Sequence, residues 1–173
     1  ELIPDGRFDN ELLQDTLKVK DAAHLGTAKP VTVYRARREG EPVALAFRAV
    51  APDGYNGRID LLVAIWADGT LAGVRAVSHA ETPGLGDGIE TAKSDWITQF
   101  AGRALGDPPR AEWKVVKDGG TFDQMTGATI TSRAVVKAVR RALKFYRLRG
   151  PEALFRRPSA HEDSTPNSAR TEP

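Results

Sequence analysis

The chain has no cysteine, one methionine and only 7% aromatic residues over 173 positions. Without cysteine, disulfides and cysteine-ligated metal sites are excluded. The longest apolar run covers residues 61–67, far short of the roughly 20 residues that a membrane span needs. A net charge of only +2 argues against a nucleic-acid partner. The composition and length therefore predict one soluble, globular domain.

A metal site is not expected either. His24, His79 and His161 are the only histidines. They lie too far apart for a local helical metal site, and no thiolate can assist them.

Two pairs of alternating segments predict hairpins. Residues 31–36 and 43–47 alternate between apolar and polar side chains on either side of a polar turn. Residues 59–66 and 71–77 flank Asp68-Gly69, a dipeptide that tolerates the positive φ angles of a tight turn. Residues 113–116 are a further strand candidate.

Helical patterns follow these hairpins. A short helix over residues 93–103 would bury Trp96, Ile97 and Phe100. The longest helical pattern covers residues 131–149 and ends at Gly150-Pro151. Strand pairs followed by helices predict an α+β fold with a mostly antiparallel sheet and a long C-terminal helix.

The two ends of the chain differ from this central part. In residues 1–30, Leu12, Leu13 and Leu17 can share a helical face before Pro30, which predicts an N-terminal helical segment. The chain after the long helix becomes polar and loses its apolar period, so residues 151–173 are predicted to form a disordered tail. The main domain would then occupy residues 31–150.

The long helix is strongly basic. It carries seven cations and no acid between positions 130 and 150: Arg133, Lys137, Arg140, Arg141, Lys144, Arg147 and Arg149. One interpretation is an anionic partner, either phosphate-rich or a lipid surface. The other is a solvated helix face whose cations suit a helix C-terminus. The sequence leaves both open.

Two loops have unusual composition. Residues 79–88 hold three glycines in five positions beside Pro83, which indicates close backbone approach to a ligand or simply a turn from strand to helix. Residues 123–132 crowd hydroxyls and Gly127-Ala128 before the long helix, where unpaired backbone N–H groups can bind an anion. Thr131 and Ser132 could also serve only as helix caps.

The two loops together resemble the signatures of the FMN-binding domain family. Asp-x-x-Thr-Gly-Ala-Thr at residues 123–129 is similar to the acceptor motif on which a flavin transferase esterifies FMN to the last threonine. Glu-Thr-Pro-Gly-Leu-Gly at residues 81–86 resembles the second signature. The family includes RnfG of the Rnf electron-transport complex and NqrC of the sodium-pumping NADH:quinone reductase. Gly-Leu-Gly-Asp with the following Ile89-Glu90, and then Trp96 and Phe100, resemble RnfG more closely.

The resemblance implies that residues 31–150 form an FMN-binding domain with a covalent FMN at Thr129, and it assigns roles to neighbouring residues. Asp123 would serve recognition by the transferase. Lys117 would be a neighbour of the cofactor. The remaining expected cofactor-binding residues are Thr126, Gly127, Ala128, Thr131, Glu81, Thr82, Gly84, Leu85 and Gly86.

The implied function is an electron relay within a membrane complex that couples electron transfer between ferredoxin and NAD to ion translocation. The protein would be an enzyme only as a redox subunit of that complex, because FMN supplies the redox chemistry. The expected partners are the other subunits and the flavin transferase. The chain starts at Glu1 rather than Met, so we expect a single membrane helix upstream, in the bacterial inner membrane, with the soluble domain in the periplasm.

Three alternatives stay open. The chain could be an NqrC-type protein of the sodium-pumping reductase, or a non-redox module whose basic helix binds lipid. It could also be an enzyme with Thr129 as nucleophile. This alternative is disfavoured because no His or Lys lies near Thr129 in the sequence to act as its base.

Overall fold

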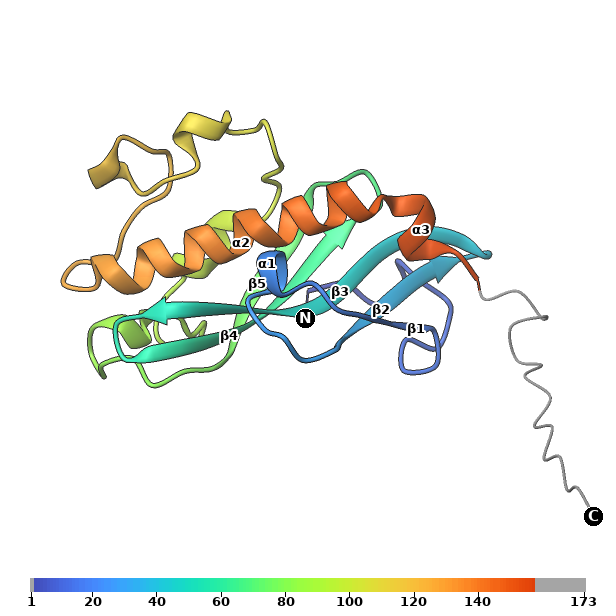
Figure 1. The fold of residues 1–173 in the computed structure, drawn as a ribbon, viewed down its shortest axis with the longest axis horizontal. Coiled ribbons are helices and arrows are strands. Elements are labelled where there is room, and N and C mark those ends of the chain that lie inside the picture. Colours follow the sequence, from blue (N-terminus) through green and yellow to red (C-terminus); the bar gives the residue numbers. More distant parts are fainter. Residues whose placement is uncertain (1, 158–173) are drawn as a thin grey trace, which may run out of the picture.

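The computed structural model describes residues 2–157, and its centre is a five-stranded antiparallel sheet in the order β1-β2-β3-β4-β5. The strands are β1 (Thr16–Val19), β2 (Val31–Arg38), β3 (Glu41–Gly54), β4 (Gly57–Trp66) and β5 (Leu71–Ser78). Each strand pairs with its neighbour in the sequence, so the sheet is a simple meander (Figure 1). Both predicted hairpins are confirmed.

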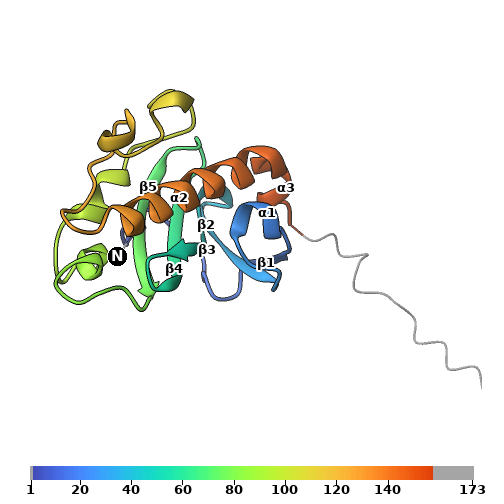
Figure 2. The same cartoon turned by 60° about the vertical axis from the view of Figure 1, so that its left-hand side comes forward.

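The helix α2 (Thr129–Arg149) lies across one face of this sheet (Figures 1 and 2). Its apolar stripe, which includes Val135, Val139 and Ala142, is buried against β3 and β4. Phe145 meets Phe47 of β3 edge to face, with ring centroids 5.1 Å apart. Because inward-facing side chains alternate along β3 and β4, the helix and the sheet enclose the main core. The predicted α+β class with a long C-terminal helix is confirmed.

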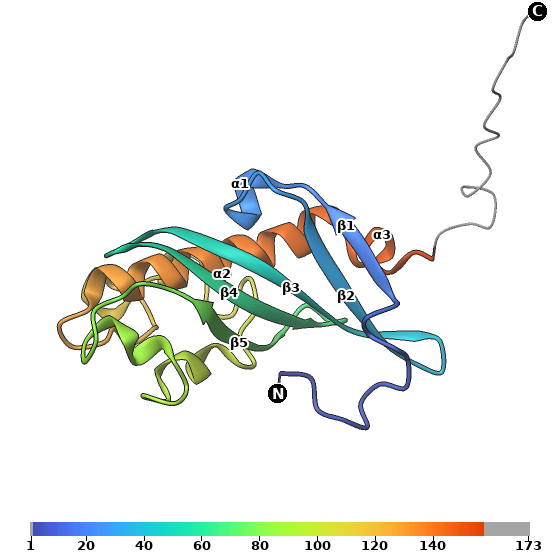
Figure 3. The same cartoon turned by 90° about the horizontal axis from the view of Figure 1, so that it is seen from below.

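The N-terminal segment, residues 2–12, covers part of the opposite face of the sheet (Figure 3). Ile3 is buried against the small side chains Ala36, Ala44 and Ala64. The guanidinium of Arg7 lies over the ring of Trp66, 4.6 Å from its centroid.

The prediction of an N-terminal helical segment over residues 1–30 is therefore wrong. Leu12 and Leu13 lie in turns and Leu17 lies in β1. The only helix within residues 2–30 is the single turn α1 (Ala22–Leu25), capped by Asp21. A leucine spacing that suits a helix equally suits a strand beside a turn, and pairing with β2 decides between them.

Between β5 and α2 the chain forms four short 3-10 helices, η1 (Gly86–Ile89), η2 (Trp96–Phe100), η3 (Arg110–Glu112) and η4 (Val116–Asp118). The burial of Trp96, Ile97 and Phe100 is confirmed, although their helix is 3-10 rather than α. The strand predicted at residues 113–116 is wrong. Val115 makes only an isolated bridge to Phe122, because the aromatic packing of Trp113 and Phe122 fixes this segment instead.

The prediction of a disordered tail from residue 151 is also wrong at its start. Residues Pro151–Phe155 form a further helix, α3, and Leu154 and Phe155 are buried. The rest of the predicted tail, residues 158–173, lies outside the described residues. No helix in the described part of the chain is long and apolar enough to cross a bilayer.

Two buried arginines tie α3 to the sheet. Arg35 and Arg37 of β2 are 3% and 4% exposed. Both donate to the carboxylate of Asp15, each at 2.7 Å, and Arg35 also donates to the carbonyl of Arg156 at 2.7 Å. Partial burial alone would raise the pKa of Asp15. The hydrogen bonds and charges of Arg37 and Arg35 together outweigh this effect and lower that pKa.

We therefore expect Asp15→Ala to lower the free energy of unfolding by about 2–3 kcal/mol, because it leaves two buried guanidinium groups without their carboxylate. The measurement is urea denaturation, with Glu11→Ala as an exposed control in the same segment. The pKa of Asp15 is lower in the folded state than in the unfolded state. Its contribution to stability is therefore fully present above the unfolded pKa of about 4, and it is lost as pH falls from there through the folded pKa. Equal losses in both variants would contradict this assignment.

Candidate functional site

The two unusual loops of the sequence meet at the N-terminal end of α2. They line an open pocket of about 460 Å³. Three segments contribute to its wall: the tip of the β3–β4 hairpin, the loop after β5 and the start of α2. The lining residues are Tyr55, Thr82, Leu85, Gly86, Gly127, Ala128, Thr129, Ile130 and Thr131.

A buried carboxylate holds the three segments together. Glu81 is 4% exposed. Its Oε1 atom accepts hydrogen bonds from the backbone N–H of Tyr55 and from the hydroxyl of Thr131, both at 2.9 Å. Its Oε2 atom accepts from the backbone N–H of Asn56 at 2.8 Å. Glu81 therefore lies behind the pocket wall and fixes the hairpin tip against the first turn of α2.

The helix begins two residues earlier than the sequence pattern indicated. Thr129 is its first residue, and Ala128 precedes it without any side-chain cap. Thr131 and Ser132 consequently lie inside the first turn and are not N-caps. Thr131 turns inward to Glu81, and Ser132 donates to the carbonyl of Ala128 at 2.8 Å.

Ser132 also organises the loop before the helix. Its hydroxyl accepts a hydrogen bond from the backbone N–H of Met125 at 2.9 Å, and Ala128 N–H donates to the carbonyl of Met125 at 3.1 Å. These bonds close residues 125–128 into a turn in which Gly127 has φ +74°. Leu85 packs so closely against Gly127 that a Cβ there would lie 3.0 Å from its Cδ2 atom. Glycine at 127 thus satisfies both the turn and the close approach.

Gly86 has a similar packing role on the other loop. A Cβ at this position would lie 2.9 Å from both the Cβ of Glu81 and the Oγ1 of Thr131. The glycine lets the loop after β5 pass close to the start of α2, so the pocket wall is continuous.

The first turn of α2 presents backbone N–H groups to the pocket. The first amides of a helix have no partner within the helix, and no side chain caps this one. Ala128, Thr129, Ile130 and Thr131 all line the cavity, so this wall combines free amides with the positive end of the helix dipole.

The rest of the wall is apolar and open to solvent. Tyr55, Leu85 and Ile130 line it with exposed fractions of 64%, 46% and 49%. Large apolar side chains are rarely left this exposed together without a ligand or partner. A flat, partly apolar ligand with an anionic group at one end would match the wall.

Most of the residues singled out in the sequence are brought to this place, but not all line the same cavity. Thr126 and Gly84 line a second hollow, which shares Leu85 with the first. Asp123 lies at the surface, with its backbone N–H bound to Gln99 at 2.9 Å. Lys117 is exposed on η4 and does not line the pocket.

Sequence reasoning missed two contributors. Tyr55 and Asn56 form the hairpin tip that Glu81 holds, 26 and 25 residues before it in the chain. No local motif marks them, and only the register of β3 and β4 brings them to the site.

Removing the carboxylate should release the hairpin tip. We expect Glu81→Ala to lower the free energy of unfolding by about 2–4 kcal/mol, because three donors lose their shared acceptor. Hydrogen exchange should accelerate at the amides of residues 55 and 56. Glu90→Ala, which removes a more exposed carboxylate, is the control. Unchanged exchange at the tip would contradict the role of Glu81.

Comparison with known proteins places the site in a family. The model of the FMN-binding domain family matches residues 54–144, which include the hairpin tip, both loops and most of α2. The chain is also similar to proteins named as the G subunit of an ion-translocating oxidoreductase complex. In Shewanella baltica (strain OS223) the identity is 51% over 146 residues, covering 84% of this chain and 69% of the relative.

Two further relatives of the same name agree. In Pseudomonas aeruginosa (strain UCBPP-PA14) the identity is 51% over 157 residues, covering 88% of this chain and 73% of the relative. In Pseudoalteromonas atlantica (strain T6c) the identity is 48% over 155 residues, covering 90% of this chain and 72% of the relative. The chain belongs to the FMN-binding domain family and, within it, to the proteins that form the G subunit of ion-translocating oxidoreductase complexes.

Proposed function

We propose that this chain is an electron-relay subunit that carries FMN esterified to Thr129 in an Rnf-type complex. The complex would couple electron transfer between ferredoxin and NAD to ion translocation. The observation that carries the proposal is the position of Thr129. It is the first residue of α2 and lies on the wall of the pocket that the two signature loops share.

The residues at Thr129 suit a phosphodiester. An ester at the threonine hydroxyl would place its negative charge beside the uncapped amides of the first turn. The helix dipole contributes about 0.3–1 kcal/mol to such an anion when it is exposed. Gly127 and Ala128 keep the approach free of long side chains.

The apolar wall suits the flavin ring. Leu85, Tyr55 and Ile130 offer exposed contact surface, and a cavity of about 460 Å³ falls within the roughly 300–1,000 Å³ of typical ligand sites. Thr82 lines the same cavity and contributes a polar group to this surface. Glu81 acts as a positioning residue, since it is buried behind the wall.

When bound, FMN supplies the electron-transfer chemistry, and the protein supplies position and electrostatics. The open wall leaves one side of the site accessible to a redox partner. A covalent bond to Thr129 would prevent loss of the cofactor from such an exposed site. We therefore infer no stand-alone catalysis by the chain.

Asp123 suits recognition by a flavin transferase. Its backbone N–H donates to Gln99 and its carbonyl accepts from the indole N–H of Trp96, so its position is fixed while the residue is exposed. Its carboxylate makes no ion pair or hydrogen bond with another residue in the range 2–157, so it is available to an enzyme that approaches the acceptor loop. Lys117 does not line the pocket and remains only a proposed neighbour of the cofactor.

The names of the relatives support the wider setting. They belong to an ion-translocating oxidoreductase complex, so the other subunits of such a complex are the proposed partners. Attachment to the inner membrane through an upstream helix, with this domain in the periplasm, belongs to the same proposal. These names favour an RnfG-type protein over an NqrC-type protein of the sodium-pumping reductase.

We expect Thr129→Ala to abolish covalent flavin while the fold is kept. The side chain of Thr129 makes no hydrogen bond within the described residues, so its loss should change the free energy of unfolding by less than about 1 kcal/mol. The measurement is co-expression with a flavin transferase, followed by in-gel flavin fluorescence and mass analysis of the peptide that contains residue 129.

Two controls make the assignment specific. Thr129→Ser keeps a hydroxyl at this position and should keep the flavin. Thr131→Ala should also keep the flavin, although it should lower stability because it removes the bond to Glu81. Fluorescence of the denatured Thr129→Ala protein would show that another hydroxyl carries the cofactor.

A further inference from the structure

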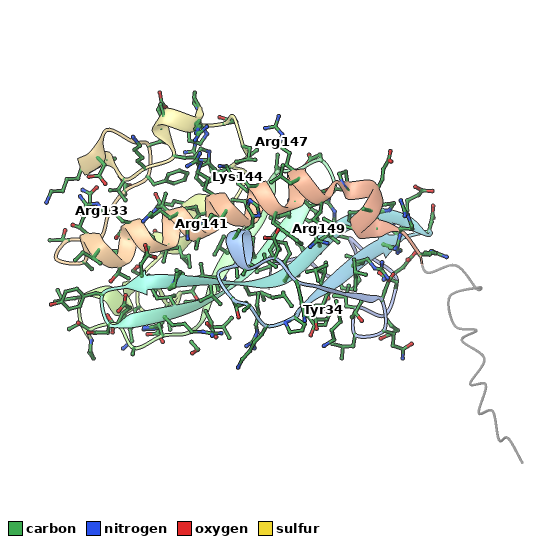
Figure 4. The ribbon with its side chains drawn as sticks, in the orientation of Figure 1. Tyr34, Arg133, Arg141, Lys144, Arg147 and Arg149 are labelled. Carbon is green, nitrogen blue, oxygen red and sulfur yellow. The ribbon has the colours of Figure 1, made fainter. Side chains whose placement is uncertain are left out.

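The cations of α2 divide into two groups with different surroundings. Arg133 is paired with Asp118 at 2.6 Å, and Lys137 with Asp53 at 3.0 Å. Near the other end, Arg149 donates to the carbonyl of Lys20 at 2.7 Å. The cations between these points have no carboxylate within ion-pair distance among residues 2–157: Arg140, Arg141, Lys144 and Arg147. Figure 4 labels the last three of them.

A fifth cation comes from outside the helix. Arg110 on η3 lies close enough to act on Lys144 electrostatically. The charge of Arg140, together with desolvation and the charges of Arg110 and Arg141, lowers the pKa of Lys144. We call Arg110, Arg140, Arg141, Lys144 and Arg147 the basic cluster.

Part of this cluster is desolvated without compensation. The Nη2 atom of Arg140 is buried and has no hydrogen-bond partner. Like charges held together, one of them with an unsatisfied donor, destabilise the isolated domain. The helix dipole favours cations only in the last turn. Within the cluster it accounts for Arg147 but not for Arg140, Arg141 and Lys144.

A notch lies directly beside the cluster. It has a volume of about 330 Å³ and is lined by Leu105, Leu143, Pro151 and Arg147 among others. Asp68 also lines it, but its carboxylate accepts hydrogen bonds from the backbone and hydroxyl of Thr70. The segment that carries η3 rises beside α2 on the side away from the sheet (Figures 1 and 2).

From this arrangement we propose that the basic cluster binds an acidic surface of a partner protein, with carboxylates over Lys144 and Arg141 and an apolar side chain in the notch. Such a partner would supply the missing counter-charges. The surface lies toward the opposite end of α2 from Thr129, about 22 Å along the helix at 1.5 Å per residue. It is therefore separate from the proposed flavin site.

The shape favours a protein over a lipid bilayer. A protein side chain can enter the notch between α2, the β4–β5 turn and residues 104–105, whereas a bilayer surface is flat on this scale. Among the residues that the structure describes, Leu148 is the one large apolar side chain exposed on the C-terminal half of α2. A single leucine offers little apolar area for insertion among lipids.

The experiment places a photo-reactive amino acid, p-benzoylphenylalanine, at Leu148, which is 70% exposed. The full-length protein is produced in the organism that encodes it, the cells are irradiated, and the cross-linked peptides are identified by mass spectrometry. We expect a protein peptide with several Asp or Glu residues. We also expect Arg141→Glu with Lys144→Glu to lower its yield at least tenfold.

The matched control is Lys18→Glu with Lys29→Glu, which makes the same change in net charge at exposed positions on other elements. It should leave the yield within a factor of two, and the melting temperatures of both double variants should agree. Four results would each overturn the proposal: cross-links to phospholipid only, cross-links to a peptide without acidic residues, no cross-link, or equal yields in the two double variants.

Discussion

The site depends on one buried carboxylate. Glu81 follows β5 by three residues, yet its two oxygens bind the tip of the β3–β4 hairpin and the first turn of α2. The close approach of the two loops at Gly86 and Gly127 adds to these bonds. A buried carboxylate is costly unless it accepts several hydrogen bonds, and here three donors are supplied by two elements. The same bonds that satisfy the charge therefore define the geometry of the pocket.

The start of α2, in contrast to Glu81, has polar groups that no side chain among residues 2–157 satisfies. Its first amides are left without a side-chain cap, although a chain rich in threonine and serine at this point could have provided one. Thr131 and Ser132 turn inward to fix Glu81 and the 125–128 loop. As a result, the helix terminus stays open to an external anion while its surroundings are held in place. This combination suits a site that holds a phosphate by a covalent bond and weak electrostatic contacts.

Much of this could be predicted from the sequence, and the misses have physical causes. The hairpins and the long helix were accessible because period-2 and period-3.6 patterns are local, and the two motifs identified the pocket loops. Tyr55 and Asn56 were not accessible, since they reach the site only through strand register. The N-terminal segment was mistaken for a helix because its leucines fit either pattern. The α3 turn was missed because the burial of Leu154 and Phe155 depends on contacts with a sheet that lies far earlier in the chain.

The two-residue tip of the β3–β4 hairpin has a consequence for how this family can vary. Gly54 pairs with Gly57, so only Tyr55 and Asn56 bridge the strands, and both of their amides are bound by one carboxylate. An inserted residue would move at least one amide out of reach and reverse the facing of the tip. Length changes at this hairpin should be selected against, whereas the segments between η2 and η4, which do not touch Glu81, can lengthen or shorten. Within homologous chains, the spacing of the hairpin tip is then a better marker of an intact pocket than overall identity.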